Sequence, residues 1–170
     1  MADRNVVLTG FLGTGKTTVG RVLAGLLGYD FVDTDQVIET RHGPSPTIFA
    51  EHGEGVFRQY ERDVAEELAD RGGLVVATGG RMMIDAVNAE NLSATGDVFC
   101  LVATVDTILE RVAPDGDATA RPMLGGGDVR GTVERLLGER APAYAAFRAI
   151  STDGREPADI AAEIASAVGG

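Results

Sequence analysis

A glycine-rich octapeptide lies between an apolar pentapeptide and an amphipathic segment near the start of the chain. Residues 10–17 read Gly-Phe-Leu-Gly-Thr-Gly-Lys-Thr and match the phosphate-loop pattern G-x-x-x-x-G-K-[ST] at every fixed position. The run 5–9 before it suits a buried strand, and residues 16–27 carry an apolar stripe at helical spacing. A strand, a phosphate-binding turn and a helix in this order predict an α/β fold that binds a nucleotide where the helix begins.

One residue of this loop stands apart in the composition. Of the 15 lysines and arginines, Lys16 alone is a lysine. A compact ammonium can reach between phosphate groups, whereas the guanidinium of arginine is a planar fork. The motif therefore predicts that Lys16 contacts the β- and γ-phosphates of ATP and that the Thr17 hydroxyl binds Mg²⁺. The other expected ATP contacts in the loop are Gly13, Thr14, Gly15 and Thr18.

Short apolar runs alternate with helical patterns along the rest of the chain. Further strands are expected near residues 29–32, 74–78, 98–102 and 149–151. Further helices are expected directly after Asp35 and near residues 57–71, 84–92, 105–112, 133–144 and 158–168. This alternation implies one α/β domain, residues 1–170, with a parallel sheet that carries helices on both faces.

Two segments interrupt the alternation. Pro44 and Pro46 predict a break without a helix, since proline lacks the N–H that a helix interior needs. Residues 113–128 are rich in glycine, proline and aspartate, a composition that predicts a mobile lid.

The acidic composition restricts the partners. With 26 acidic against 15 basic residues, the formal net charge is −11, and such a surface repels nucleic-acid backbones. No run approaches the roughly 20 apolar residues of a membrane span. A start without signal-peptide features and a single cysteine, Cys100, favour the cytoplasm. We expect a cytoplasmic monomer in which locally clustered arginines hold anionic ligands.

Polar residues follow the second and third expected strands. Asp33 and Asp35, at positions i and i+2 of an extended chain, are expected to project to one side. One carboxylate then suits Mg²⁺ held through water, and the other suits proton abstraction from an attacking hydroxyl. The alternative is an acidic turn in which Asp35 or Thr34 caps a helix. Thr78-Gly79-Gly80 either lets the backbone approach a ligand closely or simply turns into a helix.

Several arginines are candidates for anion binding. Arg58 and Glu61 are one helical turn apart, and the residues alone favour an ion pair on a solvated face over a substrate-binding arginine fixed by Glu61. Arg121, in the expected lid, is the best candidate for a phosphate clamp. Arg140 and Arg155 fit either a ligand contact or a surface position.

The ordered set of motifs resembles the shikimate kinase family, P-loop kinases of the nucleoside-monophosphate-kinase-like group. The resemblance runs from the first strand to about Pro157 and rests on residues 10–21, 33–35, 57–61, 78–80, 121–124 and 140–144. It implies a three-layer P-loop kinase fold whose five-stranded parallel sheet has the order 2-3-1-4-5, with an acceptor-binding segment at about 33–61 and a lid at about 113–128. It also implies ATP- and Mg²⁺-dependent phosphorylation of the 3-hydroxyl of shikimate, in aromatic amino-acid biosynthesis.

The resemblance implies roles for residues at the phosphoryl-transfer centre. Asp35 would hold the acceptor hydroxyl and serve as the base, with Lys16 and Arg121 as the other catalytic residues. Arg121 would close over the phosphates, and Arg155 would lie near the adenine. Asp33 would hold Mg²⁺ through water, next to Thr17.

On the acceptor side, the resemblance implies that Arg58 and Arg140 grip the shikimate carboxylate. Gly79 and Gly80 would contact the substrate, the backbone of Gly80 at its ring hydroxyls.

Two features depart from the family pattern. Arg81 replaces the third glycine after the third strand, where its side chain would clash with shikimate, bind an anion or point into solvent. Residues 43–49 are about one residue shorter and richer in proline than usual.

Other functions remain open at this point. One alternative is a kinase for another hydroxylated acid, such as gluconate, or for a nucleotide. Another is a regulatory module that binds ATP without turnover. A GTPase of the switch type is excluded, because its guanine-reading N-K-x-D segment needs a second lysine and Lys16 is the only one.

Overall fold

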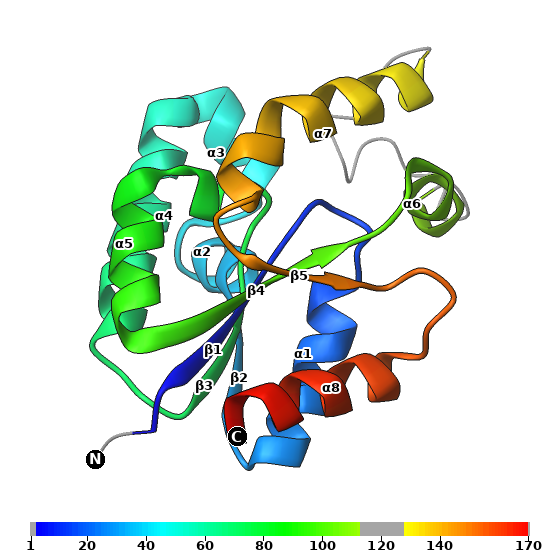
Figure 1. Ribbon diagram of the computed structural model, residues 1–170. Helices are drawn as coiled ribbons and strands as arrows, with labels where there is room; N and C mark the ends of the chain where they lie inside the picture. Colours follow the sequence, from blue (N-terminus) through cyan, green and yellow to red (C-terminus); the bar gives the residue numbers. More distant parts are fainter. Residues whose placement is uncertain (1–2, 113–127, 170) are drawn as a thin grey trace.

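The computed structural model describes residues 3–112 and 128–169 of the chain. Strands and helices alternate through most of its length (Figure 1). The strands are β1 (Asn5–Thr9), β2 (Asp30–Asp33), β3 (Leu74–Ala77), β4 (Gly96–Val102) and β5 (Arg148–Ser151). The helices are α1 (Lys16–Leu27), α2 (Thr34–His42), α3 (Ser45–His52), α4 (Glu54–Ala69), α5 (Ala86–Thr95), α6 (Val105–Val112), α7 (Val129–Tyr144) and α8 (Pro157–Gly169), with a 3₁₀ turn, η1 (Met82–Ile84), before α5.

All five strands run parallel in one sheet of order β2-β3-β1-β4-β5, which confirms the predicted topology. In the centre, Val7 of β1 pairs with Val76 of β3 and with Val98 of β4. The side chains of β1 and β3 are buried throughout, which explains why both segments are continuous apolar runs. Because parallel strands end at the same edge, the segments that follow β1, β2 and β3 meet there.

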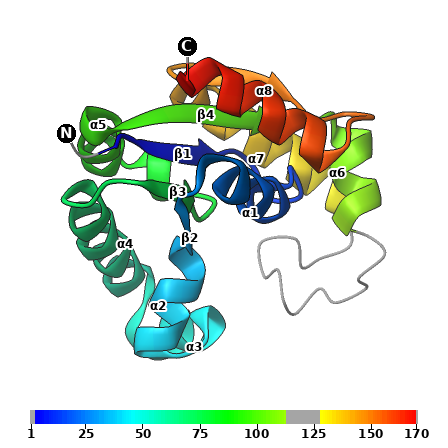
Figure 2. The same ribbon diagram turned by 90° about the horizontal axis from the view of Figure 1, so that it is seen from below.

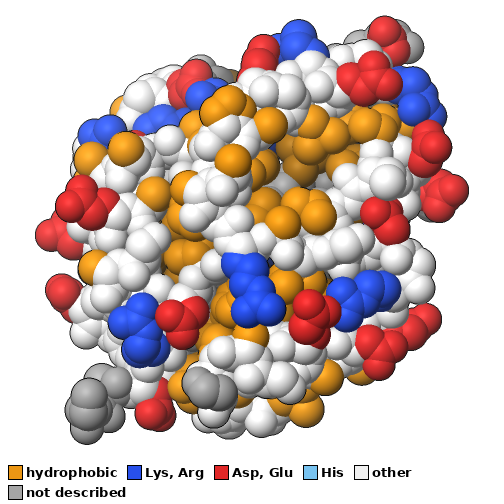
Figure 3. Space-filling view, in the orientation of Figure 1, with side chains coloured by type: hydrophobic (Ala, Val, Ile, Leu, Met, Phe, Trp, Pro, Cys, Tyr) orange, Lys and Arg blue, Asp and Glu red, His pale blue; other side chains and the backbone are white. Residues whose placement is uncertain are grey.

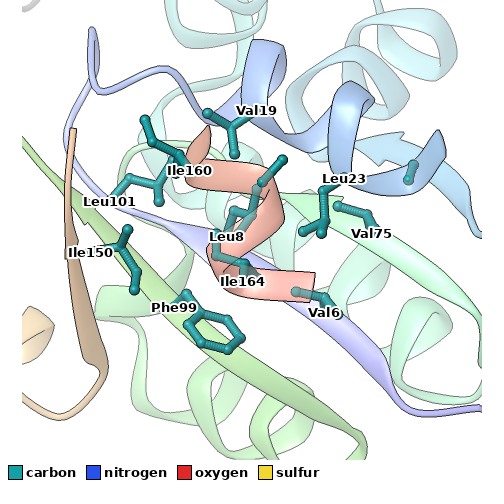
Figure 4. Close-up of a cluster of buried hydrophobic side chains, with 12 residues drawn as sticks. Val6, Leu8, Val19, Leu23, Val75, Phe99, Leu101, Ile150, Ile160 and Ile164 are labelled. Carbon is teal, nitrogen blue, oxygen red and sulfur yellow. The ribbon is translucent and has the colours of Figure 1, made fainter. Parts of the chain in front are cut away.

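Helices cover both faces of the sheet. α1 and α8 pack together on one face, and α4 and α5 lie on the other (Figures 1 and 2). On the first face, Leu23 and Ile164 form a buried cluster with Leu8 and Phe99 of the sheet (Figure 4). Burial of each such side chain contributes about 1.5–3 kcal/mol. α2 and α3 extend beyond the end of β2 (Figure 2), at the edge where the phosphate loop lies.

The prediction of a helix-free break around the two prolines is wrong. α3 begins at Ser45, with Pro44 as its N-cap and Pro46 in its first turn. The first N–H groups of a helix have no acceptor within it, so proline removes no hydrogen bond at these positions. The break is confined to the residues before α3, where Gly43 has a φ of 94°.

Most of the expected lid lies outside the described residues. The described part of the expected lid is Asp128, the N-cap of α7. Residues 113–127, and with them Arg121, are not among the described residues. Within the described ranges, no helix is long and apolar enough to cross a membrane. On the face drawn in Figure 3, acidic and basic side chains are interspersed around hydrophobic ones and form no continuous basic surface.

A buried amide ties the first strand to two later elements. The Nδ2 group of Asn5 donates to the carbonyls of Leu68 (3.2 Å) and Arg71 (2.8 Å) at the end of α4. Its Oδ1 accepts from the N–H of Leu74 (3.0 Å), where β3 begins. Asn5 is fully buried, and its side chain satisfies the hydrogen bonding of two backbone carbonyls and one backbone N–H.

Asn5→Ala is expected to lower the free energy of unfolding by about 2–4 kcal/mol, because two carbonyls and one N–H lose their partner inside the fold. Urea denaturation measures this loss. Asn91→Ala is the matched control, since Asn91 is only partly buried on α5, and it should change stability by less than about 0.5 kcal/mol. Equal destabilisation by both variants would contradict the role assigned to Asn5.

Candidate active site

The phosphate loop turns sharply between β1 and α1. Gly10, Gly13 and Gly15 have φ values of 136°, 76° and 93°, which other residues rarely adopt. Gly15 is the N-cap of α1, so the loop ends at the positive end of this helix. The Lys16 ammonium donates to the carbonyls of Gly10 (2.7 Å) and Phe11 (2.9 Å). The loop thus positions backbone N–H groups and an ammonium where phosphates are predicted to bind.

Asp33 fixes the first turn of α2. Its Oδ1 accepts from the backbone N–H groups of Asp35 (3.0 Å) and Gln36 (3.2 Å), and its Oδ2 accepts from the Thr17 hydroxyl (3.2 Å). Asp33 is therefore the N-cap, and the alternative in which Asp35 or Thr34 caps this helix is wrong. The two aspartates also do not share a strand, because β2 ends at Asp33 and Asp35 lies in the helix. Both carboxylates nevertheless line the same cavity.

The turn after β3 packs against this helix start. The Gly79 N–H donates to the Thr34 hydroxyl (2.9 Å). A Cβ atom at Gly79 would collide with the carboxylate of Asp35. Glycine at this position therefore lets the backbone of the turn approach the Asp35 side chain. The predicted close approach to a ligand stays a prediction.

Two ionisable groups at this edge have strongly shifted pKa values. Burial lowers the pKa of Lys16 to about 8, an effect that the negative charge of Asp35 partly offsets. Burial and the nearby charge of Asp33 raise the pKa of Asp35 to about 6, although Lys16 opposes this shift. Such shifts in a cleft are typical of groups that take part in chemistry.

These groups line a cavity of about 530 Å³ at the carboxyl edge of the sheet. One end of the cavity, called the donor end because the phosphoryl donor is predicted to bind there, is formed by the phosphate loop and the start of α1. Its lining residues are Leu12, Gly13, Gly15, Lys16, Thr17 and Thr18. The remaining lining residues, from the end of β2 to the turn after β3, are Asp33, Asp35, Glu39, Ser45, Pro46, Phe49, Phe57, Arg58, Glu61, Ala77, Thr78, Gly80 and Arg81. The phosphate loop and Asp35, the predicted base, thus line the same cavity as two arginines, Arg58 and Arg81.

Arg58 of α4 is held in place from several sides. Its Nη1 pairs with Oε1 of Glu61 at 2.5 Å, and its Nε lies 3.3 Å from Oε1 of Glu54. Its guanidinium also lies over the rings of Phe49 and Phe57. The side chain of Glu61 is only 2% exposed, and burial raises its pKa while Arg58 opposes the rise. This pair is therefore not the solvated-face ion pair that the residues alone favoured.

Two side chains of α7 reach the turn after β3. Arg140 Nη1 (3.2 Å) and the Tyr144 hydroxyl (2.9 Å) both donate to the carbonyl of Gly80. Arg140 is buried, and its guanidinium lies 5.1 Å from the ring centre of Phe11. Sequence reasoning assigned no role to Tyr144, although its i,i+4 spacing from Arg140 places both on one helix face.

Sequence reasoning also missed an arginine that braces the phosphate loop. Arg111 of α6 donates to the carbonyl of Gly13 (3.0 Å) and to the hydroxyl and carbonyl of Thr152 (3.0 and 3.1 Å). Arg155 lies three residues after Thr152 and pairs with Glu163 of α8 (2.6 Å). The one feature of the sequence that could have drawn attention to Arg111 is that it is the single arginine of residues 105–112. Its contacts join segments far apart in sequence, which spacing alone does not reveal.

Two side-chain oxygens at the donor end could take part in holding a divalent cation. Thr17 and Asp33 place two oxygen ligands within hydrogen-bonding distance of each other, and Mg²⁺ prefers oxygen ligands. In the described part of the chain, no group of three or more His, Cys, Asp or Glu side chains could hold a metal ion. The phosphates and water would therefore supply most of the coordination.

Comparisons with known proteins identify the family. A family model described as shikimate kinase matches residues 12–169. The shikimate kinase of Moorella thermoacetica is 42% identical over 166 residues, which cover 96% of this chain and 94% of that protein. The shikimate kinase of Geobacter sulfurreducens is 42% identical over 167 residues, which cover 97% and 91%.

Solved structures show the same relationship. A shikimate kinase from Acinetobacter baumannii in complex with shikimate superposes with a TM-score of 0.90 at 38% identity, covering 98% of this chain and 93% of that one. A gluconokinase from Sinorhizobium meliloti reaches a TM-score of 0.65 at 18% identity, covering 98% and 91%, and shares the fold alone. Because the family model spans nearly the whole chain and relatives match at about 40% identity, the chain belongs to the shikimate kinase family.

Proposed function

We propose that this protein transfers the γ-phosphoryl group of ATP to the 3-hydroxyl of shikimate, which yields shikimate 3-phosphate and ADP. The observation that carries the proposal is the position of Asp35, in a cavity shared with the phosphate loop on one side and Arg58 on the other. The charges of both Lys16 and Arg58 act on its carboxyl group. A hydroxyl bound at Asp35 would thus face the phosphates, while a carboxylate on the same molecule would face an arginine.

The donor half of the mechanism is electrostatic. Phosphoryl transfer needs alignment and neutralisation of charge more than covalent chemistry. Lys16 would exchange the carbonyls of its own loop for the β- and γ-phosphates, and the backbone N–H groups of residues 13–18 would hold the phosphate oxygens. Thr17, with Asp33 through water, would hold Mg²⁺, which neutralises phosphate charge when bound. Arg121 would close over the phosphates, and Arg155 would lie near the adenine.

The acceptor half needs a base and a carboxylate site. Asp35 would accept a hydrogen bond from the 3-hydroxyl and take its proton as the new P–O bond forms. Arg58, oriented by Glu61, would bind the shikimate carboxylate, with Arg140 as the second arginine of this contact. The backbone of Gly79 and Gly80 would contact the remaining ring hydroxyls. Asp35, Arg58 and Glu61 belong to the proposed acceptor-binding segment, at about residues 33–61 of a single domain.

Purified protein with Mg²⁺ and ATP is expected to release ADP in a shikimate-dependent manner. A coupled ADP assay measures the rate, and the product is identified as the 3-phosphate by mass spectrometry and NMR. A panel that includes gluconate, quinate and a nucleoside monophosphate serves as the control. Turnover with another member of the panel but not with shikimate would overturn the acceptor assignment. ATP binding without turnover of any acceptor would support a regulatory module instead.

Asp35→Asn is expected to lower kcat on the order of a hundredfold or more, because the amide cannot accept the hydroxyl proton. Steady-state kinetics with shikimate measure the effect. Asp63→Asn, at an exposed position of α4, is the matched control and should keep kcat within about twofold. A near-normal kcat for the Asp35 variant would exclude its role as the base.

The pH dependence should follow the two shifted groups. Below about pH 6, Asp35 takes up a proton, so kcat/KM for shikimate should fall as the pH decreases. Above about pH 8, Lys16 loses its proton, so kcat/KM for ATP should fall as the pH increases. Bound phosphates favour the ammonium form, so the alkaline limb of kcat at saturating ATP should move to higher pH. An alkaline limb that stays in place would contradict the role of Lys16.

A further inference from the structure

Arg81, at the turn into η1, shares a carboxylate with Arg58. Oε1 of Glu54 lies 3.3 Å from Nη1 of Arg81 and 3.3 Å from Nε of Arg58. One glutamate oxygen therefore bridges a cation from the turn after β3 and a cation from α4. The side chain of Arg81 is 49% exposed and also lines the cavity, so it lies at the rim within reach of a bound ligand.

Arg81 compensates the charge of one of the two glutamates that lie against Arg58. Two glutamates contact Arg58, namely Glu54 and Glu61. With Arg58 as the only cation, this group would carry a formal charge of −1 and would oppose the approach of a carboxylate. Arg81 brings the formal charge to zero. Its charge also acts on the buried carboxyl of Glu61, which lines the cavity.

The side chain of Arg81 is held at the wall of the cavity. Its backbone has φ −118° and ψ 0°, a conformation open to any residue. The two residues that follow, Met82 and Met83, are buried and anchor the turn. The contact with Glu54 directs the guanidinium of Arg81 to the side of the cavity that Arg58 occupies. This geometry favours a cation that adds to the carboxylate site over an obstruction at the acceptor hydroxyls.

We propose that Arg81 is a specificity-determining residue that supplies a further cation, in addition to Arg58 and Arg140, for the carboxylate of an acidic acceptor. Glu54 holds both arginines in place until the acceptor binds. The acceptor carboxylate then competes with Glu54 for the two guanidinium groups. This inference rests on the proposed function, because it assumes that the carboxylate of the acceptor is bound at Arg58.

Arg81→Gln tests the proposal through the split between KM and kcat. KM for shikimate should rise about three- to tenfold with kcat within about twofold, since the lost interaction serves binding and not the chemical step. Arg81→Lys should keep KM within about threefold, because it retains the charge. For shikimate methyl ester, which lacks the negative charge, Arg81→Gln should change kcat/KM by less than twofold. Arg135→Gln is the matched control, because it removes an exposed arginine of α7 that pairs with Glu139.

A charge-balance cycle with Glu54 separates this role from a local packing effect. Glu54→Gln should lower KM for shikimate, and the double variant with Arg81→Gln should have a lower KM than Arg81→Gln alone. An unchanged or lower KM in Arg81→Gln would overturn the proposal, as would an equal effect on the methyl ester. The proposed function fails separately, if the unmodified protein does not turn over shikimate. Should it turn over another hydroxy acid, the same variants are compared with that acid and its ester.

Discussion

The pairing of β1 with β3 on one side and β4 on the other is the constraint on which the site depends. Its register places Leu8 beside Ala77 and Phe99. A shift by one residue would exchange the side chains that face the two helical layers, so core packing fixes this register. The loop after β1 and the turn after β3 consequently leave the sheet at the same level. The apolar core thus brings the phosphate loop and the Gly79-Gly80 turn together without help from a ligand.

The same packing determines the electrostatics of the cavity. Glu61 and Arg140 are buried, and Lys16 and Asp35 are partly buried. Each removal of a charge from water carries a cost. The opposing shifts of Lys16 and Asp35 reflect this cost, since burial favours the neutral form of each. Charges with reduced exposure to water interact with a bound anion more strongly than charges at an exposed surface do. The prearranged set of charges in the cavity therefore lowers the stability of the fold.

The sequence was most informative where periodicity and local motifs decide the structure. It predicted β1, α1 and α6 with the bounds observed, because apolar runs and the glycine loop mark them. It failed at α3, where a rule for helix interiors was applied to prolines that begin a helix. It also failed to find Glu54 and Arg111 as parts of the site, because their roles depend on contacts with residues far along the chain. The residues 33–35 were found as a motif, but only the structure shows which of them caps α2.

Structural and functional explanations of a polar residue need not exclude each other. Asp33 caps α2 and accepts from Thr17, so the interaction that begins the helix also orients a predicted magnesium ligand. Glu61 forms an i,i+3 pair with Arg58, as a structural explanation requires, yet its burial makes the pair a support for Arg58, the predicted carboxylate-binding arginine. Sequence spacing suggests the Arg58–Glu61 contact, whereas the cap at Asp33 emerges only from the structure. Burial at the carboxyl edge of the sheet gives that contact its second role, because a buried, paired charge has few other orientations available.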